Sequence, residues 1–159
     1  MLANGNYKNI EDIEYTDLLA VYDHLNGGIT YVYPIWIEKG GTTSIYEKIT
    51  FDDGSYIKVA GKHCLFDCEK NKYVDVSNKD EFNVGSKVYK VENNKLKKVE
   101  AIKIEYIEET VKYYDVLSTT HYNVIANDFI TTDIITQYAN ILYDFDDKAV
   151  FKNFDKVSK

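Results

Sequence analysis

The stretch YYDVLSTTHYNVIANDFITTD, residues 113–133, decides the fold. Residues 114–117 are rich in strand formers, and the polar residues 118–121 that follow them favour a turn. Residues 123–126 favour a second strand, and the Asn-Asp pair at 127–128 is typical of another tight turn. The pattern therefore predicts strand, turn, strand, turn and strand, as expected in an antiparallel β structure.

Composition limits the classes of partner. The chain has 159 residues, a length that suits one domain with an ordinary hydrophobic core. Hydrophobic residues make up 45% of it and include 15 Tyr and 7 Phe, so there is ample side-chain area to bury. The net charge of −7 argues against nucleic acid or a membrane surface, because both attract basic patches. We therefore expect no nucleic-acid partner and no membrane partner.

The sequence also predicts a soluble protein that is not secreted by a signal peptide. No apolar run approaches the roughly 18 residues that a membrane-spanning helix needs. The N-terminal residues MLANGNYKN lack the charged start and apolar core of a signal peptide. Cys64 and Cys68 are too few for a disulfide framework, which favours free thiols inside a cell.

The clearest local hairpin lies at residues 43–67, where two alternating runs flank the sequence DDGS at 52–55. Asp52 and Asp53 could indicate calcium, but the loop lacks further oxygen ligands at the spacing of a calcium site, and turn chemistry explains both residues. We therefore expect a hairpin and no metal here.

Two further segments favour strands. Residues 29–37 have apolar side chains at alternate positions, and Pro34 requires a sheet edge or a bend there because it has no N–H. Trp36 is expected to pack in the core or at an interface. Residues 95–109 alternate between apolar and charged side chains, which predicts a half-exposed antiparallel strand with its charges in solvent.

The first thirty residues carry the first sign of a family. Asn4-Gly5 predicts a tight turn that links two short strands, and residues 10–13 predict one helical turn. This order resembles the first motif of the Hint fold, which inteins share with the Hedgehog autoprocessing domain. The family has a Gly-Asp pair before its next strand, and Thr16-Asp17 keeps only the Asp.

The resemblance implies a nucleophile that this chain does not contain. A Cys or Ser opens the Hint domain several residues before the Asn-Gly turn, whereas this sequence begins at Met1. Two alternatives follow from the resemblance. Either Met1 is the true start and the domain was never catalytic, or the sequence is part of a longer polypeptide.

A second motif lies after the hairpin. The sequence AGKHCLF at residues 60–66 resembles the Hint motif Thr-x-x-His followed by apolar residues. In the family the His acts as a general acid toward the leaving amide nitrogen, and the Thr helps to hold the geometry. His63 occupies the His position, so it is the candidate general acid, while Ala60 replaces the Thr.

A metal site is the weaker interpretation of the same segment. A structural zinc site needs four ligands, and His63, Cys64 and Cys68 supply three at most. The adjacent His and Cys would point to opposite faces of a strand. We therefore expect a half-buried His and two packed thiols, with no metal and no cofactor.

The closing motif is incomplete. By resemblance, His121 takes the position of a turn histidine, and Asn127 that of the family's Asn-Gly turn. The family's reactive His-Asn pair aligns with Thr132 and Asp133. Asn cyclisation uses a side-chain amide nitrogen, whereas Asp carries a carboxylate at neutral pH. Cleavage at this end is therefore not expected.

These observations predict an all-β, Hint-like horseshoe of long curved antiparallel strands with pseudo-two-fold halves at residues 1–133. Residues 134–159 are expected to form a partly helical arm or linker to the rest of an assembly.

The leading functional hypothesis is a non-splicing structural or interaction module that contacts other protein chains. The Asn-, Lys-, Tyr- and Ile-rich composition resembles degenerate Hint-like domains of bacteriophage tail proteins, which implies a virion or the bacterial host cytoplasm. The alternative is a self-cleaving Hint domain whose nucleophile lies upstream of Met1, in which His63 supports the acyl shift. A β-rich binding module unrelated to Hint is the third possibility.

Overall fold

The computed structural model describes residues 1–38, 40–60, 63–113 and 117–133. These residues form one short helix of the 3-10 type and twelve strands. The elements are η1 (Ile10–Asp12), β1 (Leu19–Tyr22), β2 (Ile29–Val32), β3 (Trp36–Ile37), β4 (Thr42–Phe51), β5 (Tyr56–Val59), β6 (Cys64–Asp67), β7 (Lys72–Asp75), β8 (Lys87–Glu92), β9 (Lys95–Lys112), β10 (Leu117–Ser118), β11 (Asn123–Ala126) and β12 (Phe129–Thr132). The predicted segments 134–159 and 114–116 lie outside the described residues.

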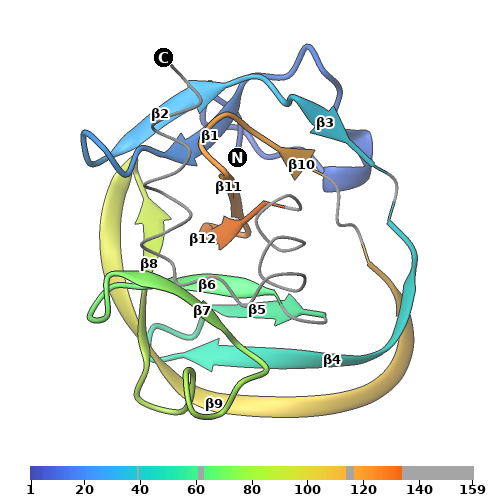
Figure 1. Cartoon of the computed structure of the whole chain (residues 1–159), viewed down its shortest axis with the longest axis vertical. Helices are drawn as coiled ribbons and strands as arrows, with labels where there is room; N and C mark the ends of the chain where they lie inside the picture. Colours follow the sequence, from blue (N-terminus) through green and yellow to red (C-terminus); the bar gives the residue numbers. More distant parts are fainter. Residues whose placement is uncertain (39, 61–62, 114–116, 134–159) are drawn as a thin grey trace, which may run out of the picture.

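All strand pairings are antiparallel within these ranges, and most strands join one curved sheet. Its order is β11-β12-β6-β8-β9-β4-β5, with β7 paired to β6, while β1-β2 and β3-β10 form two small ribbons. The 18-residue β9 pairs with β8 through its first half and with β4 through its second. Figure 1 shows β9 as a long arc around the outside, with β11 and β12 inside it. The predicted all-β, Hint-like architecture is confirmed.

The hairpin between β4 and β5 forms as predicted. Gly54 has a φ of 81°, a conformation that glycine adopts without the strain of a side chain. Asp53 accepts hydrogen bonds from the Ser55 N–H and hydroxyl, and its other carboxylate oxygen lies 3.1 Å from the Lys90 ammonium. The aspartate thus closes the turn and ties it to β8.

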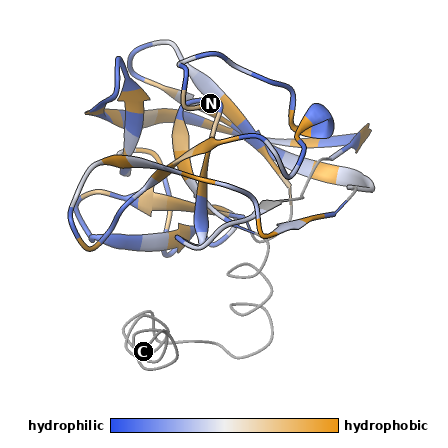
Figure 2. Cartoon of the chain, turned by 90° about the horizontal axis from the view of Figure 1, so that it is seen from above, coloured by the Kyte–Doolittle hydropathy of each residue, from blue (hydrophilic) through white to orange (hydrophobic). Residues whose placement is uncertain are grey.

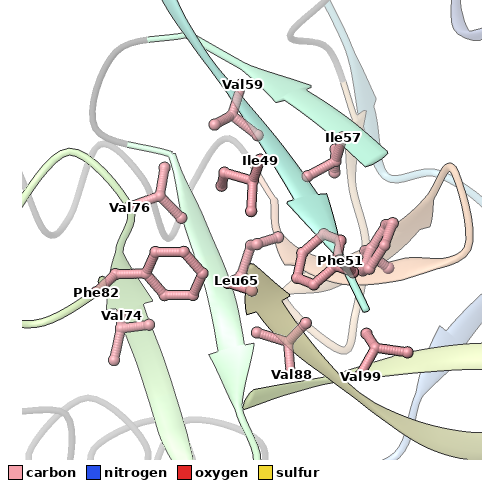
Figure 3. Close-up of a cluster of buried hydrophobic side chains, with 12 residues drawn as sticks. Ile49, Phe51, Ile57, Val59, Leu65, Val74, Val76, Phe82, Val88 and Val99 are labelled. Atoms are coloured by element: carbon pink, nitrogen blue, oxygen red, sulfur yellow. The ribbon is translucent and has the colours of Figure 1, made fainter. Parts of the chain in front are cut away.

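The main core lies between the β4-β5 hairpin and the strands β6, β7, β8, β9 and β12. Figure 3 shows its side chains converging, with Leu65 close to Phe51. Phe51 and Phe129 stack with their ring centroids 4.6 Å apart, and both are 1% exposed or less. Figure 2 shows hydrophobic residues along the strands and hydrophilic residues in many of the peripheral loops. The structure is thus a sheet curved around an aromatic and aliphatic centre.

Three local predictions have mixed outcomes. The bend at Pro34 is confirmed, because the extended segment divides into β2 and β3 around it. The Asn4-Gly5 turn forms, but the predicted two-stranded hairpin is wrong. Leu2 makes only one bridge, to Leu19, since the polar residues after the turn have no apolar face to bury. Trp36 is 45% exposed, so packing in the core is wrong for this residue.

The single helical turn predicted at residues 10–13 is confirmed as η1. None of the described residues belongs to a helix long and apolar enough to cross a membrane.

Candidate functional site

The three sequence motifs meet around the closing hairpin of β11 and β12. In β12, Thr131 pairs with Leu65 of β6, so the second and closing motifs are neighbours in one sheet. His63 immediately precedes β6, and Asp133 immediately follows β12. Strand β1, which belongs to the first motif, packs against β11. Segments far apart in sequence therefore surround one centre (Figure 1).

Asn123 connects the first and closing motifs. Its side chain is fully buried, and its amide nitrogen donates to the carbonyl oxygens of Tyr22 at 2.9 Å and His121 at 2.7 Å. Its side-chain oxygen accepts the Tyr22 N–H at 2.8 Å. The Asn123 side chain thus bonds both the N–H and the carbonyl oxygen of Tyr22, at the end of β1.

Asp133, which the sequence resemblance aligns with the family's reactive asparagine, is part of the folded framework. It is 1% exposed, and its carboxylate accepts the Thr119 N–H at 3.2 Å. Its own N–H donates to the carbonyl oxygen of Tyr122 at 3.2 Å. These bonds hold both the backbone and the side chain of Asp133 against the turn before β11.

Thr132, at the position of the family's histidine, is also buried at 1% exposed. Its hydroxyl has no hydrogen-bond partner in the part of the chain that the structure describes. A hydroxyl cannot provide the proton transfer near neutral pH that an imidazole provides. The closing pair therefore contains neither an imidazole nor a side-chain amide.

The turn between β10 and β11 is held by Thr119 rather than by His121. The Thr119 hydroxyl donates to the Asn123 carbonyl oxygen at 2.9 Å and accepts the His121 N–H at 3.3 Å. Among the described residues, the hydrogen bond of the His121 imidazole is to the neighbouring Thr120 hydroxyl, at 3.2 Å. Tyr122 adopts a φ of 57° to complete the turn. The predicted turn position of His121 is correct, whereas its function remains a prediction.

An aromatic cluster that the sequence does not reveal lies beside this centre. The His24 imidazole is hydrogen-bonded to the Tyr73 hydroxyl at 2.8 Å. Its ring centroid lies 4.8 Å from that of Tyr22 and 5.0 Å from that of Phe66. Burial in this environment, together with the nearby His121 and against the opposing effect of Asp23, lowers the pKa of His24 to about 4. His24 is therefore neutral at physiological pH.

Tyr73 joins this cluster to the closing motif. Burial raises the pKa of Tyr73, and the nearby Asp133 and Cys64 raise it further. The phenol thus stays protonated, and its hydroxyl is hydrogen-bonded to the His24 imidazole. Because His24, Tyr73 and Asn123 lie 49 to 99 residues apart in sequence, only the three-dimensional fold identifies them as a group.

His63 immediately precedes β6 and is half-buried. Its carbonyl oxygen accepts the Val76 N–H at 3.2 Å, which fixes the backbone at the start of the strand. Ala60, at the Thr position, is half-buried and offers no hydroxyl. The structure thus places His63 beside the closing motif, and its acid role remains a prediction.

The two thiols differ in burial. Cys64 is 3% exposed, Cys68 is half-buried, and neither forms a disulfide. Burial raises the pKa of the Cys68 thiol, which disfavours a reactive thiolate. Among the described residues, no three His, Cys, Asp or Glu side chains are grouped so that they could hold a metal ion.

Asn127 and Asp128 form the turn that joins β11 to β12. Both have positive φ, 50° and 73°. The Asn127 amide donates to the Tyr56 carbonyl oxygen at 2.8 Å, and the Asp128 carboxylate accepts the Tyr7 hydroxyl. That hydrogen bond raises the pKa of Tyr7 to about 12. The turn therefore links the closing hairpin to both β5 and the N-terminal segment.

Met1 lies close to the same centre. Its amino group donates to the carbonyl oxygen of Ile125 in β11 at 3.3 Å, and its side chain packs with the cluster that contains Cys64 and Ile130. Burial lowers the pKa of this amino group. The N-terminal residue of the sequence thus lies beside the strands of the second and closing motifs.

Comparison with known proteins agrees with this geometry. No family model and no curated protein matches the sequence. A DnaB intein from Synechocystis sp. PCC 6803 is similar with a TM-score of 0.71 and 15% identity, over 83% of this chain and 91% of that chain. The gp41-1 intein is similar with a TM-score of 0.58 and 22% identity, over 79% of this chain and 86% of that chain. The PabCDC21-1 intein gives a TM-score of 0.64 at 16% identity, over 84% and 93%. The chain therefore has the Hint-like fold of inteins.

Proposed function

We propose that this domain is a non-splicing Hint-like module that acts as a structural or interaction unit within a larger assembly. The observation that carries the proposal is the closing pair. Asp133 stands where the reactive asparagine would be, and its carboxylate is held by the Thr119 N–H. Function depends on the groups at a site rather than on the fold, and this site lacks the amide that cyclisation requires.

Further residues at the centre support a framework role. Asn123, Thr119 and Tyr73 use their polar groups within the protein itself. Such mutually satisfied buried groups stabilise one backbone arrangement. A rigid curved sheet with exposed aromatic residues, among them Tyr33 and Trp36, suits contact with other chains.

For the assembly we propose a bacteriophage virion, with other virion protein chains as the partners. Support for this comes from the compositional resemblance to degenerate Hint-like domains of phage tail proteins. Under this proposal the domain is found in the virion or in the host cytoplasm during assembly. Residues 134–159 would connect it to its neighbours.

The decisive experiment places residues 1–159 between two unrelated soluble proteins and follows the intact mass of the fusion. A single uncut chain, after days with and without a thiol, is the expected result. The matched control carries the gp41-1 intein between the same flanking proteins and should splice. A ligated product of the two flanking proteins from the fusion under test would overturn the proposal.

Self-cleavage at the N-terminal side is the second candidate, and one observation favours it. The Met1 amino group lies beside β11, and His63 precedes the strand that pairs with β12. A Cys or Ser placed before Met1 in the natural polypeptide would therefore enter the centre that contains His63. The mass of the natural parent protein tests this. A product that begins at or slightly before Met1, and that His63→Ala abolishes, would establish cleavage; a single uncut parent would exclude it.

A further inference from the structure

A groove lies away from the closing motif, between the sheet formed by β4 and β9 and the loop of residues 76–84 that follows β7. Its volume is about 670 Å³, within the range of small-ligand sites in proteins. Phe82, 1% exposed, and Val76, 3% exposed, contribute to its walls. The groove therefore has a fixed apolar lining that belongs to the main core.

One charged side chain breaks this apolar lining. Glu47 of β4 lies opposite Val59 of β5 and Tyr106 of β9, so it shares the face of the sheet that packs on the core. It is 5% exposed and lines the groove. Across the described part of the chain, its carboxylate has no cation and no hydrogen-bond donor other than its own backbone N–H.

Burying an ionised carboxylate without a partner is costly, so such groups are normally paired. Burial raises the pKa of Glu47, and the nearby Asp75 raises it further. The Glu81 carboxylate, which accepts the Asp75 N–H, adds a further negative charge beside Asp75. Lys79, at the rim, is exposed to solvent. The base of the groove thus offers negative charge that a cation of suitable shape could pair.

The remaining walls are suited to a flat cation on an aliphatic stem. Tyr106 is 64% exposed and Val84 59% exposed, and both line the groove beside the half-buried Ile104. An aromatic face attracts a cation, and a guanidinium stacks on it with less desolvation than an ammonium. The exposed apolar surface would cover the methylene groups of the stem.

We propose that this groove binds an arginine side chain from a partner protein, with the guanidinium paired to Glu47 and the stem against Val84, Ile104 and Tyr106. The inference rests on the proposed role as an interaction module and names one of its contact points. Glu47 supplies the charge, the tyrosine supplies the stacking surface, and the apolar walls select a long side chain over a small cation.

The test is a titration of the isotopically labelled full chain with N-acetyl-arginine methylamide, followed by NMR amide shifts. Saturable shifts in residues 76–84 and 104–106 are expected, with a dissociation constant in the millimolar range, on the order of 4 kcal/mol for one side chain. N-acetyl-citrulline methylamide has the same shape without the charge and should bind at least tenfold more weakly.

Two variants and one control make the result specific. Glu47→Gln should weaken arginine binding at least tenfold, and Tyr106→Ala, at an exposed position, should weaken it severalfold. Glu105→Gln is the matched control, because Glu105 lies on the opposite face of β9 and pairs with Lys103 at 2.8 Å. Its affinity should equal that of the wild type.

The inference is overturned if arginine gives no saturable shifts in the groove, if citrulline binds equally well, or if Glu47→Gln retains full affinity. The intact-mass assay on the same chain reports separately on splicing. An uncut chain that does not bind arginine would thus leave the proposed module in place and remove only this contact point.

Discussion

Replacing Asn123 with alanine removes the connection between β1 and β11. The substitution deletes three hydrogen bonds, two to Tyr22 and one to His121, from a side chain that is fully buried. Each such bond contributes about 1 kcal/mol net to stability, so the expected loss is about 3 kcal/mol. The loss is large because the N–H and carbonyl groups of Tyr22 remain without partners at the edge of the core.

The assay is urea unfolding of the full chain, followed by far-ultraviolet circular dichroism. With a denaturant slope of about 2 kcal/mol/M, a loss of about 3 kcal/mol lowers the midpoint by about 1.5 M. Asn123→Asp keeps an acceptor for the Tyr22 N–H but replaces the NH₂ group, which donates both other bonds, with an oxygen. It should therefore be at least as destabilising as Asn123→Ala. The exposed Asn6 provides the control, since Asn6→Ala should shift the midpoint by less than about 0.3 M. A midpoint for Asn123→Ala within that same margin of the wild type would refute the reasoning.

Three more predictions concern the centre and the groove. Burial lowers the pKa of His24 from 6.5 to about 4, so the unfolded chain takes up the proton first, and stability should fall as pH decreases from about 6.5 toward 4. Between pH 7 and pH 5 the urea midpoint of His24→Gln should therefore drop less than that of the wild type. An equal drop in the two proteins would contradict this. The double substitution Thr132→His and Asp133→Asn should allow the asparagine side chain to cyclise and release the chain after residue 133, and mass spectrometry should detect the succinimide-ended fragment. The single variant Thr132→His serves as the uncut control. An uncut double variant would mean that more than these two side chains prevents cleavage. Glu47→Gln should raise the urea midpoint at pH 7, because burial raises the folded-state pKa of Glu47 and its destabilising charge appears as pH rises through that pKa. In acid, where the Glu and the Gln side chains are both neutral, the two midpoints should be equal. A higher midpoint of the variant that persists unchanged in acid would disprove the electrostatic cause.

The strands were predictable wherever the signal was local. The DDGS turn at 52–55 and the Asn-Asp turn at 127–128 contain residues that tolerate the required backbone angles, and β5 after the first turn alternates between exposed and buried residues. The alternation of residues 95–109 predicted β9 for the same reason. The break at Pro34 followed from its missing N–H. Each of these features depends on residues that are neighbours in sequence.

The composition of the centre was predictable only in part. By resemblance, His63 and Asp133 belong to two motifs of one family, but the sequence did not predict their distance; in the structure His63 immediately precedes β6 and Asp133 immediately follows β12, and these two strands pair. His24 gave no local signal, because its partner Tyr73 is 49 residues away. Trp36 was expected to pack in the core or at an interface; it is 45% exposed, which excludes the core, since hydrophobicity alone does not decide which face of a short ribbon is covered.

Glu47 shows the opposite failure of local pattern. In sequence it stands between Tyr46 and Lys48, where a charged residue normally indicates a solvent-exposed position. The pairing of β4 with both β5 and β9 places it instead on the face that covers the core. Sheet register, which is a long-range property, therefore determined the environment of this carboxylate.

The double pairing of β9 has a consequence for how the chain reaches this fold. The first half of β9 can pair with β8 as soon as it is made, since Asn93 and Asn94 alone separate the two strands. Its second half must find β4, which is made some sixty residues earlier along the chain. Until that encounter, β4 keeps a ten-residue edge with open hydrogen-bonding groups. During synthesis and refolding, arrival of β9 is thus the step that shields β4 from pairing with a second copy of the protein.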